Sequence, residues 1–136
     1  MSASKLGRMQ LRILQVLWKK GKATAREITD ALNESEDVAH STVQTLLRKL
    51  EAKGAVGHGI EERTFVFRPL VKPETVTRRA TRELVERLFG GSAAGLVAYL
   101  LKSERIPAAE LDEIRRLIDA AEAPGRKNAA RRGKED

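Results

Sequence analysis

Short polar and basic side chains recur between residues 41 and 49, on the side of an expected helix that apolar residues leave free. Hydroxyl, amide and guanidinium groups are the side-chain groups that hydrogen-bond to base edges and phosphates. Gln44 could form two hydrogen bonds with adenine, and Arg48 could bind guanine or a phosphate. This pattern predicts a surface that reads DNA in the major groove, with the candidates Ser41, Thr42, Gln44, Thr45, Arg48 and Lys49.

Two residues outside this helix complete the candidate set. Thr24 begins another expected helix, whose unpaired backbone N–H groups could bind a phosphate. Arg63 lies at the tip of an expected β-hairpin and is a candidate for contact with the DNA backbone or the minor groove. Each residue alone is weak evidence, because serine, threonine, glutamine and arginine occupy any solvated surface. Their combination on a helix-turn-helix with a hairpin behind it is more specific.

Helical periodicity and capping residues predict the elements that position these side chains. Residues 6–18 place apolar side chains three or four positions apart, which is one face of a helix. A second helix is expected from Thr24 to about Leu32, begun by a capping box between Thr24 and Glu27. The acidic and polar stretch 33–39 is then a loop.

The third helix, which carries the candidate readers, is expected from Ser41 to Leu50, with Gly54 in the left-handed position after its end. Ser41 and Gln44 could form a second capping box, or the helix could begin earlier, at Ala39 or His40.

A hairpin follows, with strands at 55–59 and 64–67 and a turn at 60–63. Phe65 and Phe67 alternate with polar or small residues, which predicts a half-buried strand pinned against the helices. A purely structural role for this hairpin stays open at this stage, although it explains the basic tip less well.

Three further helices are expected after Pro73, separated near Gly90 and Pro107. The stretch from Ala93 to Leu101 is apolar almost all round, which implies burial on every side. Three short helices cannot enclose such a surface, so a second copy of the chain is expected to cover it; packing onto the chain's own N-terminal part is the alternative. The predicted dimerisation residues are Val76, Leu84, Leu88, Leu96, Val97, Leu100, Leu101, Leu111, Ile114, Leu117 and Ile118.

Charge divides the chain in the same way as periodicity does. The net charge of +7 is made up of +4 in residues 1–70, zero in 71–122 and +3 in 123–136. We therefore expect a mainly α fold with a small β-hairpin: a winged helix-turn-helix DNA-binding domain at 1–70, a helical dimerisation domain at 71–122 and a disordered basic tail at 123–136. The positive charge could also serve only solubility.

Several classes of protein are excluded or disfavoured by the residues present. The chain has no cysteine, which excludes disulfides, thiolate metal sites and cysteine nucleophiles. His40 and His58 are far apart, no glycine-rich phosphate loop is present and the acids are scattered, so no enzyme, metal site or cofactor is predicted. No apolar stretch approaches the roughly 20 residues of a membrane span, and no signal peptide is visible, so we expect a cytoplasmic protein without a membrane partner.

Beyond these patterns, the chain resembles the penicillinase-repressor family of bacterial transcription regulators over roughly residues 6–121. The matching pieces are Leu6-Gly7, Leu17-Trp18, Gly21 with Ala23-Thr24 and Glu27-Ile28, the run from Ser41 to Leu47, the run from Leu50 to Gly54, the hairpin strand from Arg63 to Pro69, and Phe89 to Ser92. The resemblance implies a winged-helix domain, a helical dimerisation domain and a homodimer that represses transcription on a palindromic operator in double-stranded DNA. It places Thr42, Gln44, Thr45 and Arg48 toward the bases and Arg63 on the wing.

The resemblance is less informative about the signal that ends repression. Antibiotic-sensing members are cleaved by a sensor protease at an Asn-Phe bond, and the aligned pair here is Tyr99-Leu100. Copper-sensing members carry a cysteine cluster, which this chain lacks. A second class of function, a winged-helix adaptor that binds proteins rather than specific DNA, is the alternative hypothesis.

Overall fold

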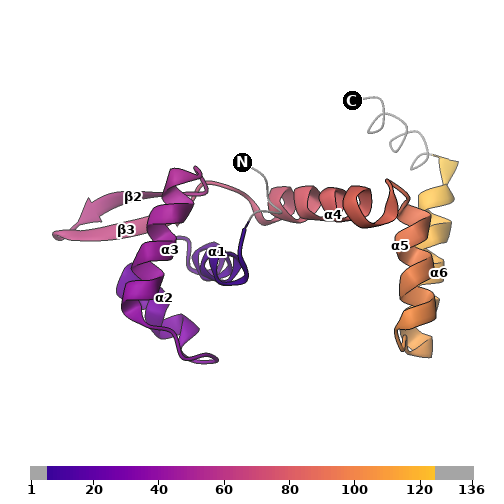
Figure 1. Cartoon of the computed structure of the whole chain (residues 1–136), viewed down its shortest axis with the longest axis horizontal. Helices are drawn as coiled ribbons and strands as arrows, with labels where there is room; N and C mark the ends of the chain where they lie inside the picture. Colours follow the sequence, from indigo (N-terminus) through magenta and orange to yellow (C-terminus); the bar gives the residue numbers. More distant parts are fainter. Residues whose placement is uncertain (1–5, 125–136) are drawn as a thin grey trace. The chain divides into compact units, whose positions relative to one another are not determined.

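The computed structural model describes residues 6–124, which form two compact units, Met1–Gly91 and Ser92–Asp136. The first unit contains three helices, a three-stranded sheet and a long helix (Figure 1). Its elements are α1 (Arg8–Lys20), β1 (Ala23–Thr24), α2 (Ala25–Leu32), α3 (His40–Ala52), β2 (Val56–Glu61), β3 (Thr64–Pro69) and α4 (Pro73–Phe89). The second contains α5 (Ala93–Ser103) and α6 (Ala108–Glu122). The winged helix-turn-helix followed by helices is confirmed, and the two compact units divide between Gly91 and Ser92, after α4.

The core of the first unit is aliphatic, as the low aromatic content requires. α1, α2 and α3 each contribute fully buried leucine, isoleucine or valine side chains, and these pack together with residues of the sheet. The buried side chains of the helices are Ile13, Leu14, Leu17, Ile28, Leu32, Val43, Leu47 and Leu50. Burying these residues fixes which side of α3 faces inward, and therefore which side remains for a ligand.

The start of α2 follows the predicted capping box, and the start of α3 follows the alternative of an earlier beginning, at His40. The Thr24 hydroxyl accepts a hydrogen bond from the Glu27 N–H (3.1 Å), and the Glu27 carboxylate accepts one from the Thr24 N–H (2.9 Å), which confirms the capping box. α3 begins at His40, with Ala39 as its cap residue and no side-chain cap. Ser41 therefore lies inside the first turn, and the second capping box is not formed.

The hairpin is longer and its turn tighter than expected. Ile60 and Glu61 belong to β2, so only Glu62 and Arg63 form the turn, and both have positive φ angles, 51° and 67°. Two consecutive residues with positive φ are typical of the two-residue turns that match the twist of paired strands. This geometry places the Arg63 backbone at the end of the hairpin, between β2 and β3.

A third strand, β1, was not predicted and makes β3 the central strand. The sheet order is β1-β3-β2, with Ala23 opposite Phe67 on one side and His58 opposite Phe67 on the other. Val66 and Phe67 are both buried, whereas Phe65 is 52% exposed. The simple alternation expected for a half-buried strand is therefore wrong here, because the successive residues Val66 and Phe67, on opposite faces of β3, are both buried.

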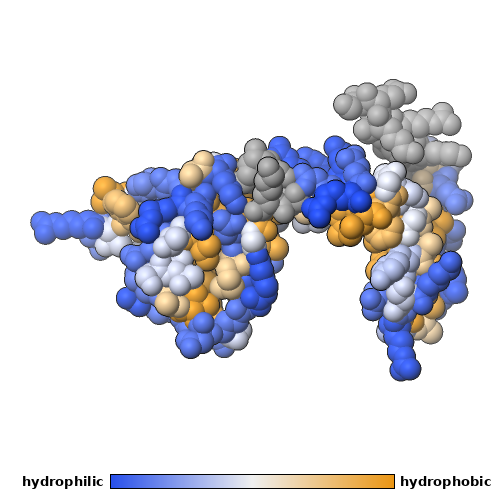
Figure 2. All heavy atoms as spheres, viewed as in Figure 1, coloured by the Kyte–Doolittle hydropathy of each residue, from blue (hydrophilic) through white to orange (hydrophobic). Residues whose placement is uncertain are grey.

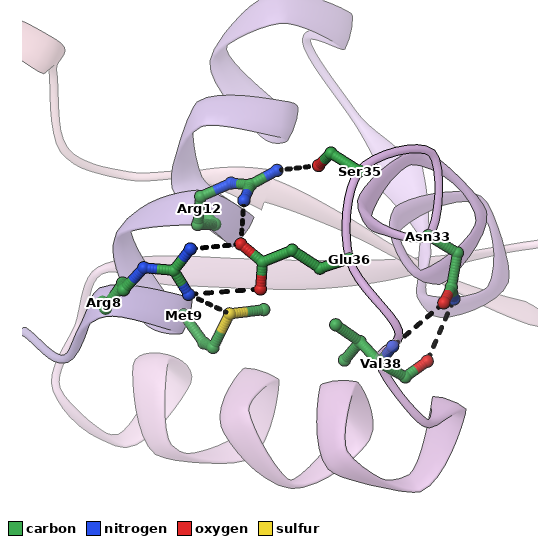
Figure 3. A network of polar contacts seen from close by, with 7 residues as sticks. All are labelled: Arg8, Met9, Arg12, Asn33, Ser35, Glu36 and Val38. Atoms are coloured by element: carbon green, nitrogen blue, oxygen red, sulfur yellow. Dashed lines mark hydrogen bonds and ion pairs between the residues drawn. The ribbon is translucent and has the colours of Figure 1, made fainter.

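The loop between α2 and α3 is held by a polar network (Figure 3). The guanidinium groups of Arg8 and Arg12 on α1 both contact the Glu36 carboxylate, and Arg12 also donates to the Ser35 hydroxyl at 2.8 Å. The hydrogen bond from Arg8 holds the pKa of Glu36 below its ordinary range. The Asn33 side chain closes the same loop through two 2.9 Å hydrogen bonds with the Val38 backbone. These contacts fix the direction in which α3 leaves the loop.

The second unit consists of two helices that bury none of their own side chains. α5 begins with the predicted cap, in which the Ser92 hydroxyl accepts a hydrogen bond from the Gly95 N–H at 2.9 Å. Hydrophobic surface gathers over α5 and α6 (Figure 2). Within residues 6–124 no single helix is long and apolar enough to span a membrane; α4 and α5 meet that criterion only when taken together as a bent pair. The predicted disordered tail lies outside the described residues from position 125 onward.

Candidate nucleic-acid interface

α3 presents all six predicted reading residues on its solvent side. Val43, Leu47 and Leu50 turn into the core, which leaves the other sides of the helix exposed. The exposed residues are Ser41, Thr42, Gln44, Thr45, Arg48 and Lys49. A helix whose apolar face packs on the core and whose exposed face is polar is suited to enter a major groove.

A groove with a volume of about 480 Å³ lies between α3, the start of α2 and the hairpin. It brings together four of the predicted residues, which come from separate segments: Thr24, Gln44, Arg48 and Arg63. The remaining predicted residues, Ser41, Thr42, Thr45 and Lys49, line a separate shallow hollow on another side of α3. The candidates on α3 therefore lie on two sides of the helix. We call these the groove side, with Gln44 and Arg48, and the outer side, with Ser41, Thr42, Thr45 and Lys49.

Three polar residues that line the groove were missed as site residues: Arg26, His40 and Thr64. Arg26 stands in the first turn of α2, two residues after the Thr24 cap, and that position was the available signal. His40 precedes Gln44 and Arg48 by one and two helical turns, so the three residues share one side of α3. Three guanidinium groups line the groove, and none of the described residues that line it is acidic.

Thr45 connects the two sides of α3. Its hydroxyl donates a hydrogen bond to the Ser41 carbonyl at 3.0 Å and accepts one from the Arg48 guanidinium at 3.3 Å. The single hydroxyl proton is therefore used within the helix. Thr45 retains a methyl group and an acceptor lone pair for a ligand, and its hydroxyl holds the Arg48 side chain along α3.

At the start of α2 the capping box limits what Thr24 itself offers. Its N–H is bonded to Glu27, so a phosphate bound here would need the backbone N–H groups of Ala25 and Arg26. Hydrogen bonds from Thr24 hold the pKa of Glu27 below its ordinary range, which keeps this carboxylate ionised. Because the Glu27 carboxylate would repel a phosphate, the favourable charge at the start of α2 comes from the Arg26 guanidinium.

A second set of contacts packs the hairpin against α3. The His58 Nδ1 atom lies 2.6 Å from the Glu51 carboxylate of α3, and the His58 ring stacks on Phe65 with ring centroids 4.5 Å apart. The buried Phe67 ring lies 5.7 Å from His58. This packing sets the distance between α3 and the hairpin tip. Among residues 6–124 no group of three or more His, Cys, Asp or Glu could hold a metal ion.

The predicted dimerisation residues fall into two classes in the single chain. Most are exposed or half-buried, with Leu100 at 41% and Leu117 at 59%. The exposed members are Leu84, Leu88, Val97, Leu100, Leu101, Leu117 and Ile118, and the half-buried members are Leu96, Leu111 and Ile114. Val76 differs, because it is already buried at 6% exposure and has little surface left for a partner.

Comparison with known proteins places this architecture in a family. The Penicillinase repressor family model matches residues 6–120. A penicillinase repressor from Bacillus licheniformis is 24% identical over 110 residues, covering 81% of this chain and 86% of the relative. One from Staphylococcus aureus is 22% identical over 107 residues, covering 79% of this chain and 85% of the relative.

Solved structures agree at the level of the fold. The YusO protein from Bacillus subtilis has a TM-score of 0.54 at 18% identity, covering 88% of this chain and 77% of its own. The hsRosR-SG complex has a TM-score of 0.51 at 21% identity, covering 90% of this chain and 99% of its own. These likenesses show the fold alone. The family model spans most of the sequence, and the chain therefore belongs to the penicillinase repressor family.

Proposed function

We propose that this protein is a sequence-specific DNA-binding transcriptional repressor that acts in the cytoplasm as a homodimer on a palindromic operator. The observation that carries the proposal is the groove. It joins the exposed amide and guanidinium groups of α3 to the arginines of α2 and the hairpin tip, with no acid among its described lining residues. Relatives named penicillinase repressors support the same function.

Base reading and phosphate binding fall to different parts of this surface. Gln44 and Arg48 lie on the groove side of α3 and suit adenine and guanine edges, respectively. Thr42 and Thr45 offer methyl groups to thymine from the outer side, where Ser41 and Lys49 are placed for phosphates. Arg26 and Arg63 line the groove from α2 and the hairpin tip, and we assign them to the DNA backbone.

The second unit supplies the pairing in this proposal. Large apolar side chains on α5 and α6 stay exposed in one chain, and a second copy would bury them. Two paired copies would present two α3 helices to half-sites about one helical turn apart, roughly 34–36 Å. Relief of repression by a sensor protease, whose identity is open, would act on α5, where Tyr99 and Leu100 are 57% and 41% exposed.

Fluorescence anisotropy with a labelled duplex from upstream of the protein's own gene tests the proposal. We expect tight binding that weakens as salt rises, and clear preference over a random duplex of equal length. Equal affinity for both duplexes would contradict a sequence-specific repressor. Absence of any salt-dependent DNA affinity would favour the adaptor hypothesis instead.

A further inference from the structure

His40 is the first residue of α3 and lies in the row that faces the groove. Gln44 and Arg48 follow it at intervals of four residues, so all three side chains lie on one side of the helix. In helix-turn-helix proteins the N-terminal residues of the reading helix contact base edges. Among the groove residues of α3, His40 lies nearest to the helix N-terminus. This end of the helix would lie deepest in a major groove.

The buried Thr29 side chain determines how the His40 ring is protonated. The Thr29 hydroxyl donates its single proton to the Ala25 carbonyl at 2.8 Å. The same oxygen lies 3.1 Å from Nδ1 of His40. With its one proton donated to the Ala25 carbonyl, the hydroxyl can only accept from the ring, and this arrangement assigns the proton of the neutral ring to Nδ1. In the neutral ring the other nitrogen, Nε2, then presents only a lone pair, on the edge of the ring away from Thr29.

We propose that His40 is a specificity-determining residue of the DNA-reading surface, whose Nε2 accepts a hydrogen bond from the exocyclic amino group of adenine or cytosine. This inference rests on the proposed function. In the major groove, adenine N6 and cytosine N4 are donors, whereas guanine O6 and thymine O4 are acceptors. An Nε2 lone pair facing either acceptor would be repelled. His40 thus selects adenine or cytosine at one position of each half-site, and Thr29 is the positioning residue that sets this choice.

Selection of binding sites from randomised DNA duplexes, followed by sequencing, tests this role with the full-length chain. We expect wild-type protein to require adenine or cytosine at one position of each half-site. His40→Ala should abolish that requirement and leave the other positions unchanged. At that position, the affinity ratio between adenine or cytosine duplexes and guanine or thymine duplexes should fall from about tenfold to about one.

Thr29→Val supplies a second variant, because valine keeps the branched shape and removes the acceptor. With the proton of His40 no longer fixed on Nδ1, the same single position should accept guanine or thymine as well. Gln15→Ala, on the exposed side of α1, is the control and should select the wild-type sequence. Thermal unfolding of each variant establishes that the winged helix is intact.

Long-range ¹H–¹⁵N correlation spectra of the protein without DNA report the tautomer directly. The Nδ1–H form of neutral His40 is expected in wild-type protein, and the Nε2–H form would overturn the proposal. Unchanged selection by His40→Ala would also overturn it, as would relaxation spread over every position, which would indicate a role in shaping α3. If wild-type protein selects no sequence at all, the proposed function fails; the tautomer, measured without DNA, distinguishes that failure from a wrong assignment at His40.

Discussion

Arg63 and Arg48 line the same groove, yet we expect their substitution to change DNA binding in different ways. Arg63 lies in the two-residue turn at the hairpin tip, with a positive φ and an exposed side chain, and the proposed function assigns it to the DNA backbone rather than to the bases. Replacing it by glutamine removes one charge per chain and leaves a shorter side chain that is still polar. Each lost phosphate contact lowers the slope of log K against log salt by about 0.9.

Because a homodimer carries two such residues, Arg63→Gln should lower the slope by about 1.8 and weaken specific and random binding equally. Arg48→Ala should instead cost about 1–3 kcal/mol per base contact on the operator and relax specificity, because Arg48 is held by Thr45 on the groove side of α3. Fluorescence anisotropy over a salt series, with operator and random duplexes, measures both quantities.

An unchanged slope for Arg63→Gln would show that the hairpin tip makes no phosphate contact. An equal loss on operator and random duplexes for Arg48→Ala would remove Arg48 from the base-reading residues. Lys102→Gln, on α5, removes one charge per chain outside the groove and is the matched control for net charge. If it lowers the slope as much as Arg63→Gln does, the effect of charge is global and the assignment to the groove is wrong.

Three further predictions concern stability and assembly. Thr24→Ala should lower the free energy of unfolding by about 1 kcal/mol in urea denaturation, because it removes the hydroxyl that caps α2; no change would mean that the capping box contributes nothing. Glu36 has a pKa below its ordinary value of 4.5 when folded, so its stabilising effect is complete above that pH and is lost as pH falls through the lower folded-state pKa. Denaturation midpoints should therefore fall less steeply in acid for Glu36→Gln than for wild type, and parallel curves would refute this coupling. Leu100→Glu places a charge on an exposed apolar side chain of α5 and should convert the dimer to a monomer in sedimentation equilibrium, whereas a persisting dimer would place the interface elsewhere.

The sequence predicted most of the elements because their signals are local. The Thr24-Glu27 capping box, the apolar spacing of α1 to α3 and the serine cap of α5 each lie within a few residues, and all three are present in the structure. The exposed side of α3 followed from the same spacing, since burial of Val43, Leu47 and Leu50 leaves only one arrangement for the polar residues.

The features that were missed depend on contacts between distant residues. β1 has two residues and hence no readable period; it exists because Ala23 and Thr24 pair with Phe67 and Val66. The turn was predicted over residues 60–63, whereas only Glu62 and Arg63 form it. The prediction was too long because these two residues lack the Asn-Gly or Asp-Gly signal of two-residue turns. Arg26 and His40 line the groove only because the fold brings α2, α3 and the hairpin together. The proposed proton on His40 Nδ1 likewise depends on Thr29, eleven positions away in the sequence.

We propose above all that the surface formed by Thr24 to Arg68 reads DNA as a pair of copies held together through α5 and α6. Sedimentation velocity of the full-length chain mixed with a fluorescent duplex from its own upstream region tests this claim directly, because the mass of the labelled complex counts the chains bound. We predict two chains per palindromic site, bound together without a populated one-chain complex. A complex of one chain per site, or no complex, would contradict DNA reading by a pair of chains.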